Sequence, residues 1–243
     1  MIVERAPAAE LIPRPLELLD AAIVEGRPLG AWSRPSEPAL VLGSGQRPPE
    51  DWRPPDGLPL VRRGTGGGAV LCDEDYLMLD IALPPGDPRV LDDVTESYRW
   101  LAERLVSALD ELGLAEISLV QPATVRGFDE QARDAGRSAC FAGLGPYELL
   151  DGQGRKLLGL AQRRRRGGVL LQAAAYLAGE REPLAGLLWL GERERRDLTR
   201  RLRDTAVLGP IGLRLPEVLG PIWELRENDR EAGTPPSIPN GRG

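Results

Sequence analysis

Apolar residues along this chain gather into short runs that are bounded by glycine, proline and acidic residues. Runs of this kind are typical of strands that lie in a largely buried sheet. The pattern predicts strands at residues 38–43, 60–63, 69–71, 76–83, 147–150, 155–162 and 169–177. An Asp-Gly-Gln-Gly segment at residues 151–154 separates the run at 147–150 from the run at 155–162, and this turn chemistry favours a hairpin.

Other parts of the chain show the hydrophobic periodicity of an amphipathic helix. Between Asp93 and Leu112 the apolar residues return every three or four positions, and Gly113 follows as a natural helix stop. Shorter stretches at residues 14–25 and 192–203 predict two further helices. Strands that are interrupted by helices indicate an α+β fold.

The remaining segments suggest how the domain is organised. The proline-rich residues 47–59 predict a loop. We expect residues 1–226 to form one catalytic domain and residues 227–243 to be a disordered tail, because the tail is rich in proline, glycine and charge.

Composition excludes several classes of function. With 42% hydrophobic and 28% charged residues, the chain has the composition of an ordinary water-soluble protein. It has no apolar run as long as a membrane span and no secretory signal at its start, so we expect a cytoplasmic protein without a membrane partner. A net charge of −6 argues against general binding to nucleic acid.

The chain contains no histidine. This excludes histidine-based acid–base catalysis, Ser–His and Cys–His dyads, and histidine metal ligands. The two cysteines, Cys72 and Cys140, form neither a zinc site nor a disulfide framework, which fits a reducing compartment. We therefore expect no metal site.

A glycine-rich segment is the first indication of a ligand site. It begins with two arginines and ends with three glycines and an alanine: Arg62, Arg63, Thr65, Gly66, Gly67, Gly68 and Ala69. Without Cβ atoms the glycines allow positive φ and a close approach of the backbone to a ligand. Their N–H groups can surround an anion, with arginine charge beside it. Taken alone, the run fits a flexible hairpin turn equally well.

A second group of motifs lies downstream. It contains Ser-Ala-Cys-Phe at 138–141, Pro-Tyr-Glu-Leu at 146–149, Gly-Arg-Lys-Leu-Leu-Gly-Leu-Ala-Gln at 154–162 and Gly-Val-Leu-Leu-Gln at 168–172. Together with the glycine-rich segment, these motifs resemble the biotin/lipoate protein ligase catalytic family over roughly residues 38–176. The resemblance implies a mixed, mostly antiparallel sheet with helices packed on it, as in class II aminoacyl-tRNA synthetases. The cysteine ahead of the lysine motif is most similar to octanoyl transferases of lipoate assembly.

The resemblance implies catalytic roles for Cys140 and Lys156. Only a thiolate attacks an acyl thioester well, and an ordinary thiol needs help to ionise at neutral pH. A lysine cation near the sulfur would favour the thiolate, whereas a neutral lysine amine would accept its proton. The plainer interpretation makes Cys140 a small buried hydrophobe and Lys156 a charge that protects a strand edge.

The family position also implies a substrate pocket. Its members would be the glycine-rich segment and three residues after the lysine: Arg62, Arg63, Thr65, Gly66, Gly67, Gly68, Ala69, Gly159, Ala161 and Gln162. The small residues at 159 and 161 leave room for a slender acyl chain, or serve close strand packing. The run of four arginines at 163–166 would steer an acidic partner, or be a solvated loop.

Some positions depart from the family pattern. Cys72 stands where relatives typically place a histidine, and Gln-Ala-Ala at 172–174 replaces their Gln-His-Gly. The family's Asn-x-Ala-x-Asp-Glu opening is not evident near residues 18–22.

Three functions follow as hypotheses. The leading one is an acyltransferase that passes octanoyl from acyl carrier protein to Cys140 and then to a lysine of a lipoyl domain or a glycine cleavage H-type protein, with no cofactor. The second is an ATP- and Mg-dependent ligase that activates lipoic acid as an acyl-adenylate, with Lys156 facing the phosphate. The third, motivated by the departures above, is a catalytically weak member that binds an acylated partner.

Overall fold

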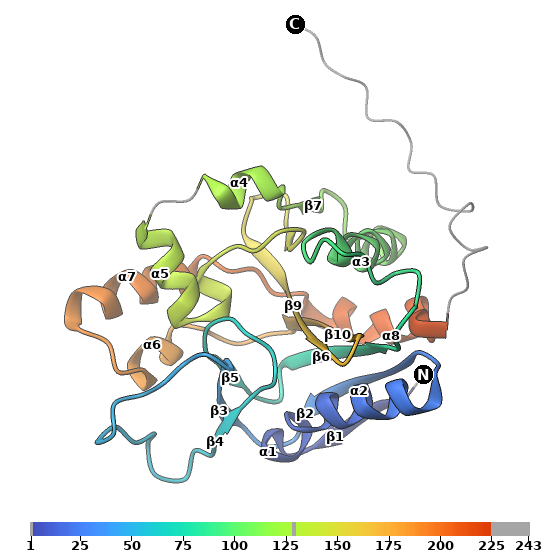
Figure 1. The fold of residues 1–243 in the computed structure, drawn as a ribbon. Coiled ribbons are helices and arrows are strands. Elements are labelled where there is room, and N and C mark those ends of the chain that lie inside the picture. The colour runs from blue at the N-terminus through green and yellow to red at the C-terminus, as the bar shows by residue number, and fades with distance from the viewer. Residues whose placement is uncertain (1, 128–129, 225–243) are drawn as a thin grey trace, which may run out of the picture.

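The computed structural model describes residues 2–127 and 130–224, so the tail expected at residues 227–243 lies outside the described residues. Its centre is a seven-stranded sheet in the order β1–β2–β6–β10–β9–β8–β7 (Figure 1). The strands of this sheet are β1 (Val3–Ala6), β2 (Leu29–Pro35), β6 (Tyr76–Leu83), β7 (Ser118–Leu119), β8 (Leu149–Leu150), β9 (Lys156–Arg165) and β10 (Gly168–Tyr176). All neighbours are antiparallel except β1 and β2.

A smaller sheet and a set of helices complete the described fold. The smaller sheet has the order β4–β3–β5 and consists of β3 (Ala39–Leu42), β4 (Leu60–Arg62) and β5 (Val70–Cys72). The helices are α1 (Ala8–Leu11), α2 (Arg14–Glu25), α3 (Arg99–Glu111), α4 (Pro122–Arg126), α5 (Glu130–Ser138), α6 (Pro183–Leu187), α7 (Glu192–Arg203) and α8 (Leu215–Leu219). The predicted α+β fold with a mixed, mostly antiparallel sheet is confirmed. None of the described helices is both long and apolar enough to cross a bilayer.

The pleat of β6 divides the interior into two sides, because successive side chains of a strand point to opposite faces. Leu77, Leu79 and Ile81 face the larger core, to which α3 contributes Leu101 and Leu105. Figure 1 shows α3 and α2 on opposite faces of the large sheet. This face therefore carries the larger hydrophobic core.

The other face of β6 is shared between packing and a cavity. Near the C-terminal end of the strand, α2 packs Leu19 and Ala22 against Ala82. Nearer its beginning, Tyr76 and Met78 face the small sheet instead. The space between α2, the small sheet and β6 is where the candidate site lies.

The glycine-rich segment connects two strands that are not neighbours. Strands β4 and β5 lie on opposite sides of β3, and β4 runs parallel to it, so they do not form a hairpin. Residues 63–69 must therefore pass across the end of β3; we call them the glycine crossover. A Cβ on Gly43, the residue after β3, would lie only 1.9 Å from the carbonyl oxygen of Gly67. The crossover thus rests directly on the backbone beneath it, and the simple hairpin interpretation is wrong.

Most predicted elements are confirmed, with differences at their ends. The helices predicted at 14–25 and 192–203 match α2 and α7. The helix predicted from residue 93 begins at Arg99, after a short 3-10 turn. Strand β9 continues to Arg165, so most of the arginine run belongs to a strand and not to a loop.

Gly68 provides a test of the crossover. A Cβ at this position would lie 2.6 Å from the backbone nitrogen of Ala139, so Gly68→Ala must displace the segment that carries Cys140. We expect this variant to lose about 1 to 3 kcal/mol of unfolding free energy in urea, as is usual for overpacking. Gly66→Ala is the matched control, because nothing lies within 4 Å of the added Cβ. Equal stability of the two variants would contradict the close approach.

Candidate active site

The candidate site is built around a buried ion pair between β9 and the segment ahead of β8. Lys156 is the first residue of β9, and its Nζ lies 2.7 Å from Oε2 of Glu148. Both side chains are buried. The carboxylate also accepts hydrogen bonds from the backbone N–H groups of Gly145, at 2.6 Å, and Leu160, at 3.1 Å. Every part of this buried charge pair is therefore compensated.

Lys156 also holds the segment that contains Cys140. Its ammonium donates to the carbonyl oxygens of Cys140, at 2.8 Å, and Gly143, at 3.0 Å. With Glu148 these oxygens occupy all three N–H donors of an ammonium group. Three acceptors fit the cation and leave no lone pair to take a proton from the thiol. The arrangement therefore opposes the proton-acceptor role considered for Lys156 and favours a positioning role.

The sulfur of Cys140 lies where two cavities meet. Cys140 is half-buried and lines a narrow slot of about 50 Å³ and an outer groove of about 760 Å³. The outer groove also contains Gln46, Gly66 and Gly67 in its wall. A group bound in the slot can thus reach the sulfur from inside while a second molecule approaches it through the groove.

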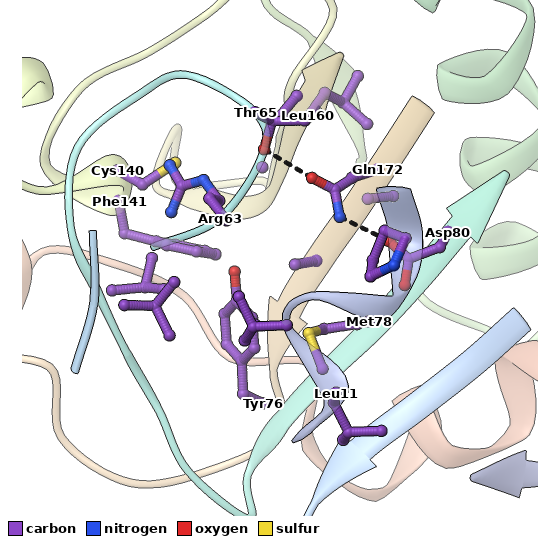
Figure 2. A pocket seen from close by; sticks show the side chains of 18 residues that line it. Leu11, Arg63, Thr65, Tyr76, Met78, Asp80, Cys140, Phe141, Leu160 and Gln172 are labelled. Atoms are coloured by element: carbon purple, nitrogen blue, oxygen red, sulfur yellow. Dashed lines mark hydrogen bonds between the residues drawn. The ribbon is translucent and has the colours of Figure 1, made fainter. Parts of the chain in front are cut away.

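Arg63 stabilises the glycine crossover beside that sulfur. Its guanidinium donates to the carbonyl oxygens of Gly66, at 2.7 Å, and Gly68, at 2.8 Å. Figure 2 shows it next to Cys140. Gly67 has φ of +92°, and a Cβ there would lie 2.8 Å from Nη2 of Arg63 and 3.7 Å from Sγ of Cys140. The turn needs glycine because it passes between a fixed positive charge and the thiol.

The slot has an apolar floor made by three strands of the large sheet. Met78, Ala174 and Gly159 are register partners across β6, β10 and β9, and all of them line the slot. Phe141 lies at the Cys140 end, where its ring packs edge-on against Tyr76 and Tyr176. At about 50 Å³ the slot is far smaller than the several hundred cubic ångströms of typical ligand pockets. An acyl chain therefore enters only if side chains move, and unbranched Met78 is the most adaptable of them.

A chain of polar side chains crosses the slot. The hydroxyl of Thr65 donates to Oε1 of Gln172 at 2.6 Å, and Nε2 of Gln172 donates to Oδ1 of Asp80 at 2.6 Å, as the dashed lines in Figure 2 show. Asp80 and Gln172 are register partners on β6 and β10. Burial raises the pKa of Asp80 to about 6, although the hydrogen bond from Gln172 acts in the opposite direction. A carboxyl group of this kind is partly protonated near neutral pH.

The structure brings most, but not all, of the predicted pocket residues together. Arg63, Thr65, Gly159 and Ala161 line the slot, and the outer groove is lined by Gly66, Gly67, Ala161 and Gln162. Gly68 and Ala69 are buried instead, and the carbonyl of Ala69 accepts the backbone N–H of Cys140 at 3.0 Å. Gly68 and Ala69 therefore contact and hydrogen-bond the backbone of the segment that carries Cys140.

Arg62 and Gly159 differ from the expected picture. Arg62 lines neither of these cavities, because its guanidinium donates to the carbonyl oxygens of Gly43 and Gln46. The room above Gly159 is also taken: a Cβ there would lie 3.3 Å from Cε of Lys156 and 3.5 Å from Oε1 of Glu148. Gly159 therefore makes space for the ion pair, and the slot passes beside it.

The second cysteine and the arginine run serve the fold. Cys72 is fully buried in the small sheet, and burial raises the pKa of its thiol far above the ordinary value. Arg164 donates to the hydroxyl of Ser97 at 2.9 Å, and Arg165 pairs with Asp20 of α2 at 3.1 Å. Much of the positive charge proposed to steer a partner is thus already engaged within the chain.

Sequence reasoning missed three polar residues of the site. Glu148 is a single charge in an apolar run, Asp80 is the only charge in β6, and Gln172 interrupts the apolar residues of β10. A lone charged residue within a fully buried strand, as Asp80 is in β6, indicates a partner or a ligand, and this signal was available. Which partner each would find depends on the tertiary fold.

Comparisons with known proteins place these observations in a wider context. Residues 28–205 match the family model described as the lipoyl protein ligase A/B catalytic domain. The octanoyltransferase LipM of an Exiguobacterium species is 36% identical over 152 residues, which are 62% of this chain and 53% of that protein. LipM of Bacillus subtilis is 32% identical over 151 residues, with coverages of 62% and 53%. The chain spans about half the length of the curated relatives it matches.

Solved structures agree in fold. A bi-partite lipoate protein ligase from Thermoplasma acidophilum superposes with a TM-score of 0.60 at 20% identity, covering 90% of this chain and 82% of that one. Lipoate-protein ligase A bound with ATP gives a TM-score of 0.53 at 19% identity, covering 90% and 92%. At such identities the likeness shows the fold alone. It confirms the sheet architecture that the motifs implied.

Removing Lys156 tests the buried ion pair. Lys156→Ala leaves Glu148 as a buried carboxylate without its counter-ion, which typically costs about 3 to 5 kcal/mol of unfolding free energy. The matched control is the neighbouring Arg155→Ala, which breaks a more exposed pair with Asp151 and should cost less than about 1 kcal/mol. Urea unfolding measures both. Losses of similar size would mean that the buried pair does not hold the segment.

Asp80 makes stability depend on pH. Its carboxyl binds a proton more tightly in the folded chain, with a pKa of about 6 against 3.8 for the ordinary group. This tighter proton binding adds to the unfolding free energy. The added stability is fully present below pH 3.8 and is lost as the pH rises through about 6, a change on the order of 2 to 3 kcal/mol. Asp80→Asn keeps an acceptor for Gln172 but cannot ionise, so the variant should gain on the wild type between pH 4 and 8. Parallel stability profiles would contradict this.

Proposed function

The chain belongs to the lipoyl protein ligase A/B catalytic domain family, and on that premise we propose that it is an acyltransferase of protein lipoylation. The acyl group, octanoyl or lipoyl, is carried on Cys140. The donor is an octanoyl thioester of acyl carrier protein, and the acceptor is a lysine of a lipoyl domain or a glycine cleavage H-type protein. The observation that carries the proposal is the position of Cys140 at the junction of the slot and the outer groove. We also propose that residues 1–226 are one catalytic domain.

In the first step the Cys140 thiolate attacks the thioester carbonyl of the donor. A new carbon–sulfur bond forms, the old one breaks, and the carrier leaves as a thiol after taking a proton. The guanidinium of Arg63 lies beside Cys140, where it places a fixed positive charge next to the reacting group (Figure 2). Gly66 and Gly67 line the groove, and among the described residues their N–H groups have no hydrogen-bond acceptor, so we assign these groups to the tetrahedral oxyanion.

In the second step a lysine amine attacks the acyl-cysteine. The amide bond forms, the Cys140 thiol is released, and the amine loses one proton to solvent or to the departing sulfur. Both steps exchange a thioester for a thioester or an amide, so neither needs ATP. Lys156 and Glu148 act as positioning residues, because they hold the carbonyl of Cys140 and leave the sulfur free to turn between the slot and the groove.

One feature supports the ligase alternative. The outer groove adjoins the glycine crossover and is lined by Arg133 and Arg137 of α5, an arrangement that also fits the phosphate of an acyl-adenylate. Lipoate-dependent exchange of pyrophosphate into ATP would favour that function. If the chain binds an acylated partner but shows no turnover in either the acyl-transfer or the pyrophosphate-exchange assay, it would be a catalytically weak member of the family.

Acylation of Cys140 is the decisive experiment. We expect incubation with octanoyl-acyl carrier protein to add one octanoyl group in the intact mass spectrum, mapped by peptide analysis to Cys140. Cys140→Ala should lose both the adduct and transfer to a lipoyl domain, the latter by a thousandfold or more, on the order seen for removal of a nucleophile.

Cys72→Ala is the matched control, because that thiol is sealed in the small sheet. It should keep the adduct. Octanoylation that persists in Cys140→Ala, or the failure of every thioester donor to modify the wild type, would overturn the proposal.

A further inference from the structure

We propose that Arg133 and Arg137 of α5 form a phosphate-binding site in the outer groove, which recognises the phosphopantetheine arm of the thioester donor. This rests on the proposed function, because it assumes that the acyl group is transferred to Cys140. It goes further in naming the part of the donor that the groove binds: the phosphate ester at the end of the arm, and not the surface of the protein that carries it.

The charges that line the outer groove are unbalanced toward the positive. Lys156 and Glu148 lie 2.7 Å apart and neutralise each other. The other charged residues in the described lining are Arg133 and Arg137. Both are exposed, and they lie one turn apart on the same side of α5. The groove thus offers a local positive charge in a chain whose net charge is −6.

The fold leaves most of the donors of these two arginines unused. Arg133 donates to the carbonyl oxygen of Arg126 at 3.2 Å, and Arg137 pairs with Asp134 at 3.0 Å. The pair with Asp134 is exposed to solvent, and such pairs contribute little stability. A guanidinium has five N–H donors, so both arginines keep donors for a ligand. Arg133 also lies near the start of α5, where the helix dipole favours negative charge, so a cation there does not serve the helix.

The spacing between Cys140 and the two arginines matches the length of the arm. Arg137 is three residues before Cys140, at most roughly 10 Å away at about 3.5 Å per residue. Arg133 lies four residues further back, about 6 Å along the helix at about 1.5 Å per residue. From its thioester sulfur to its phosphorus the arm has about thirteen bonds, or roughly 15 Å at about 3.5 Å for every three bonds. With the thioester at Cys140, the phosphate therefore reaches α5.

Between these two ends, part of the groove wall is bare backbone. Gly45 and Gly66 have open space where a Cβ would lie. Gly136 packs so closely on Gly143 that a Cβ on it would lie 3.2 Å from the Cα of Gly143. Without side chains, such a wall lets a ligand contact peptide groups directly. The arm suits it, because the arm is uncharged between its ends and carries two amides of its own.

An acyl-adenylate would use the arginine pair less fully. One oxygen joins its phosphate to the acyl carbonyl, so the phosphate would stay close to Cys140. The two arginines instead extend back along α5, away from the cysteine. A phosphate that is separated from the carbonyl by a long arm is the one that can lie between both.

The test compares two donors that differ only in the phosphate, octanoyl-phosphopantetheine and octanoyl-pantetheine. Neither carries a protein, so an acidic carrier surface cannot contribute. Intact mass at timed quench points gives kcat/KM for acylation of Cys140 in the full chain. We expect the phosphate to raise kcat/KM at least tenfold, mainly through a lower KM, because the phosphate lies far from the reacting carbonyl. The double variant Arg133→Gln, Arg137→Gln should bring the ratio of the two constants close to one.

The double variant Arg126→Gln, Arg193→Gln is the matched control, because it removes the same charge from exposed arginines that do not line the groove. It should keep the wild-type ratio. The ratio separates recognition from folding, since a loss of folded protein slows both donors equally. Free phosphopantetheine should also slow acylation by octanoyl-pantetheine more strongly than AMP does.

The inference would be overturned by a wild-type ratio near one, by a ratio that the α5 variant keeps or the control loses, or by inhibition by AMP as strong as by phosphopantetheine. Acylation by octanoyl-pantetheine tests the proposed function separately. If neither donor acylates Cys140, the proposed function fails, and calorimetry with phosphopantetheine and pantetheine tests the arginine site alone. Tighter binding of the phosphorylated arm that is lost in the α5 variant would support the site. Equal binding, or a preference that survives in that variant, would exclude it.

Discussion

The buried pair of Lys156 and Glu148 is the interaction on which the site depends. Buried ion pairs contribute little net stability, because desolvation offsets most of their attraction. What this pair provides is position: its hydrogen bonds join β9, the segment before β8 and the carbonyl of Cys140. A hydrophobic replacement would fill the same volume but would not fix where the sulfur lies. The lysine of the family motif is thus explained by geometry as much as by charge.

A second constraint is the path of the glycine crossover over the end of β3. Because β4 and β5 lie on opposite sides of that strand, the connection has to run across its last residue at backbone contact. Gly43 below and Gly68 above leave no room for side chains, and Gly67 takes a conformation that favours glycine. The same crossover brings Gly67 close to Cys140 in the wall of the outer groove. Packing and chemistry therefore require the same residues.

The pleat of the large sheet explains how one strand serves two purposes. On one face, leucine and isoleucine residues of β6 join the core beneath α3. On the other face, Tyr76, Met78 and Asp80 line the slot. A change of one residue in register would exchange the two sets, so the core fixes the orientation of the slot. Asp80 can be polar because it lies on the slot face of β6 and not on the face that packs into the larger core.

The sequence alone determined the elements with strong local periodicity, such as α2, β6 and α7, because their patterns repeat within a few residues. It also pointed to Cys140, Lys156 and the glycine run, whose order resembles a known family. Only the tertiary structure decided that Lys156 holds a carbonyl of the cysteine segment, that Arg62 turns away from both cavities, and that Asp80 lines the slot. The physical reason is that these contacts join residues far apart in sequence, and their partners are chosen by how the sheets and helices pack.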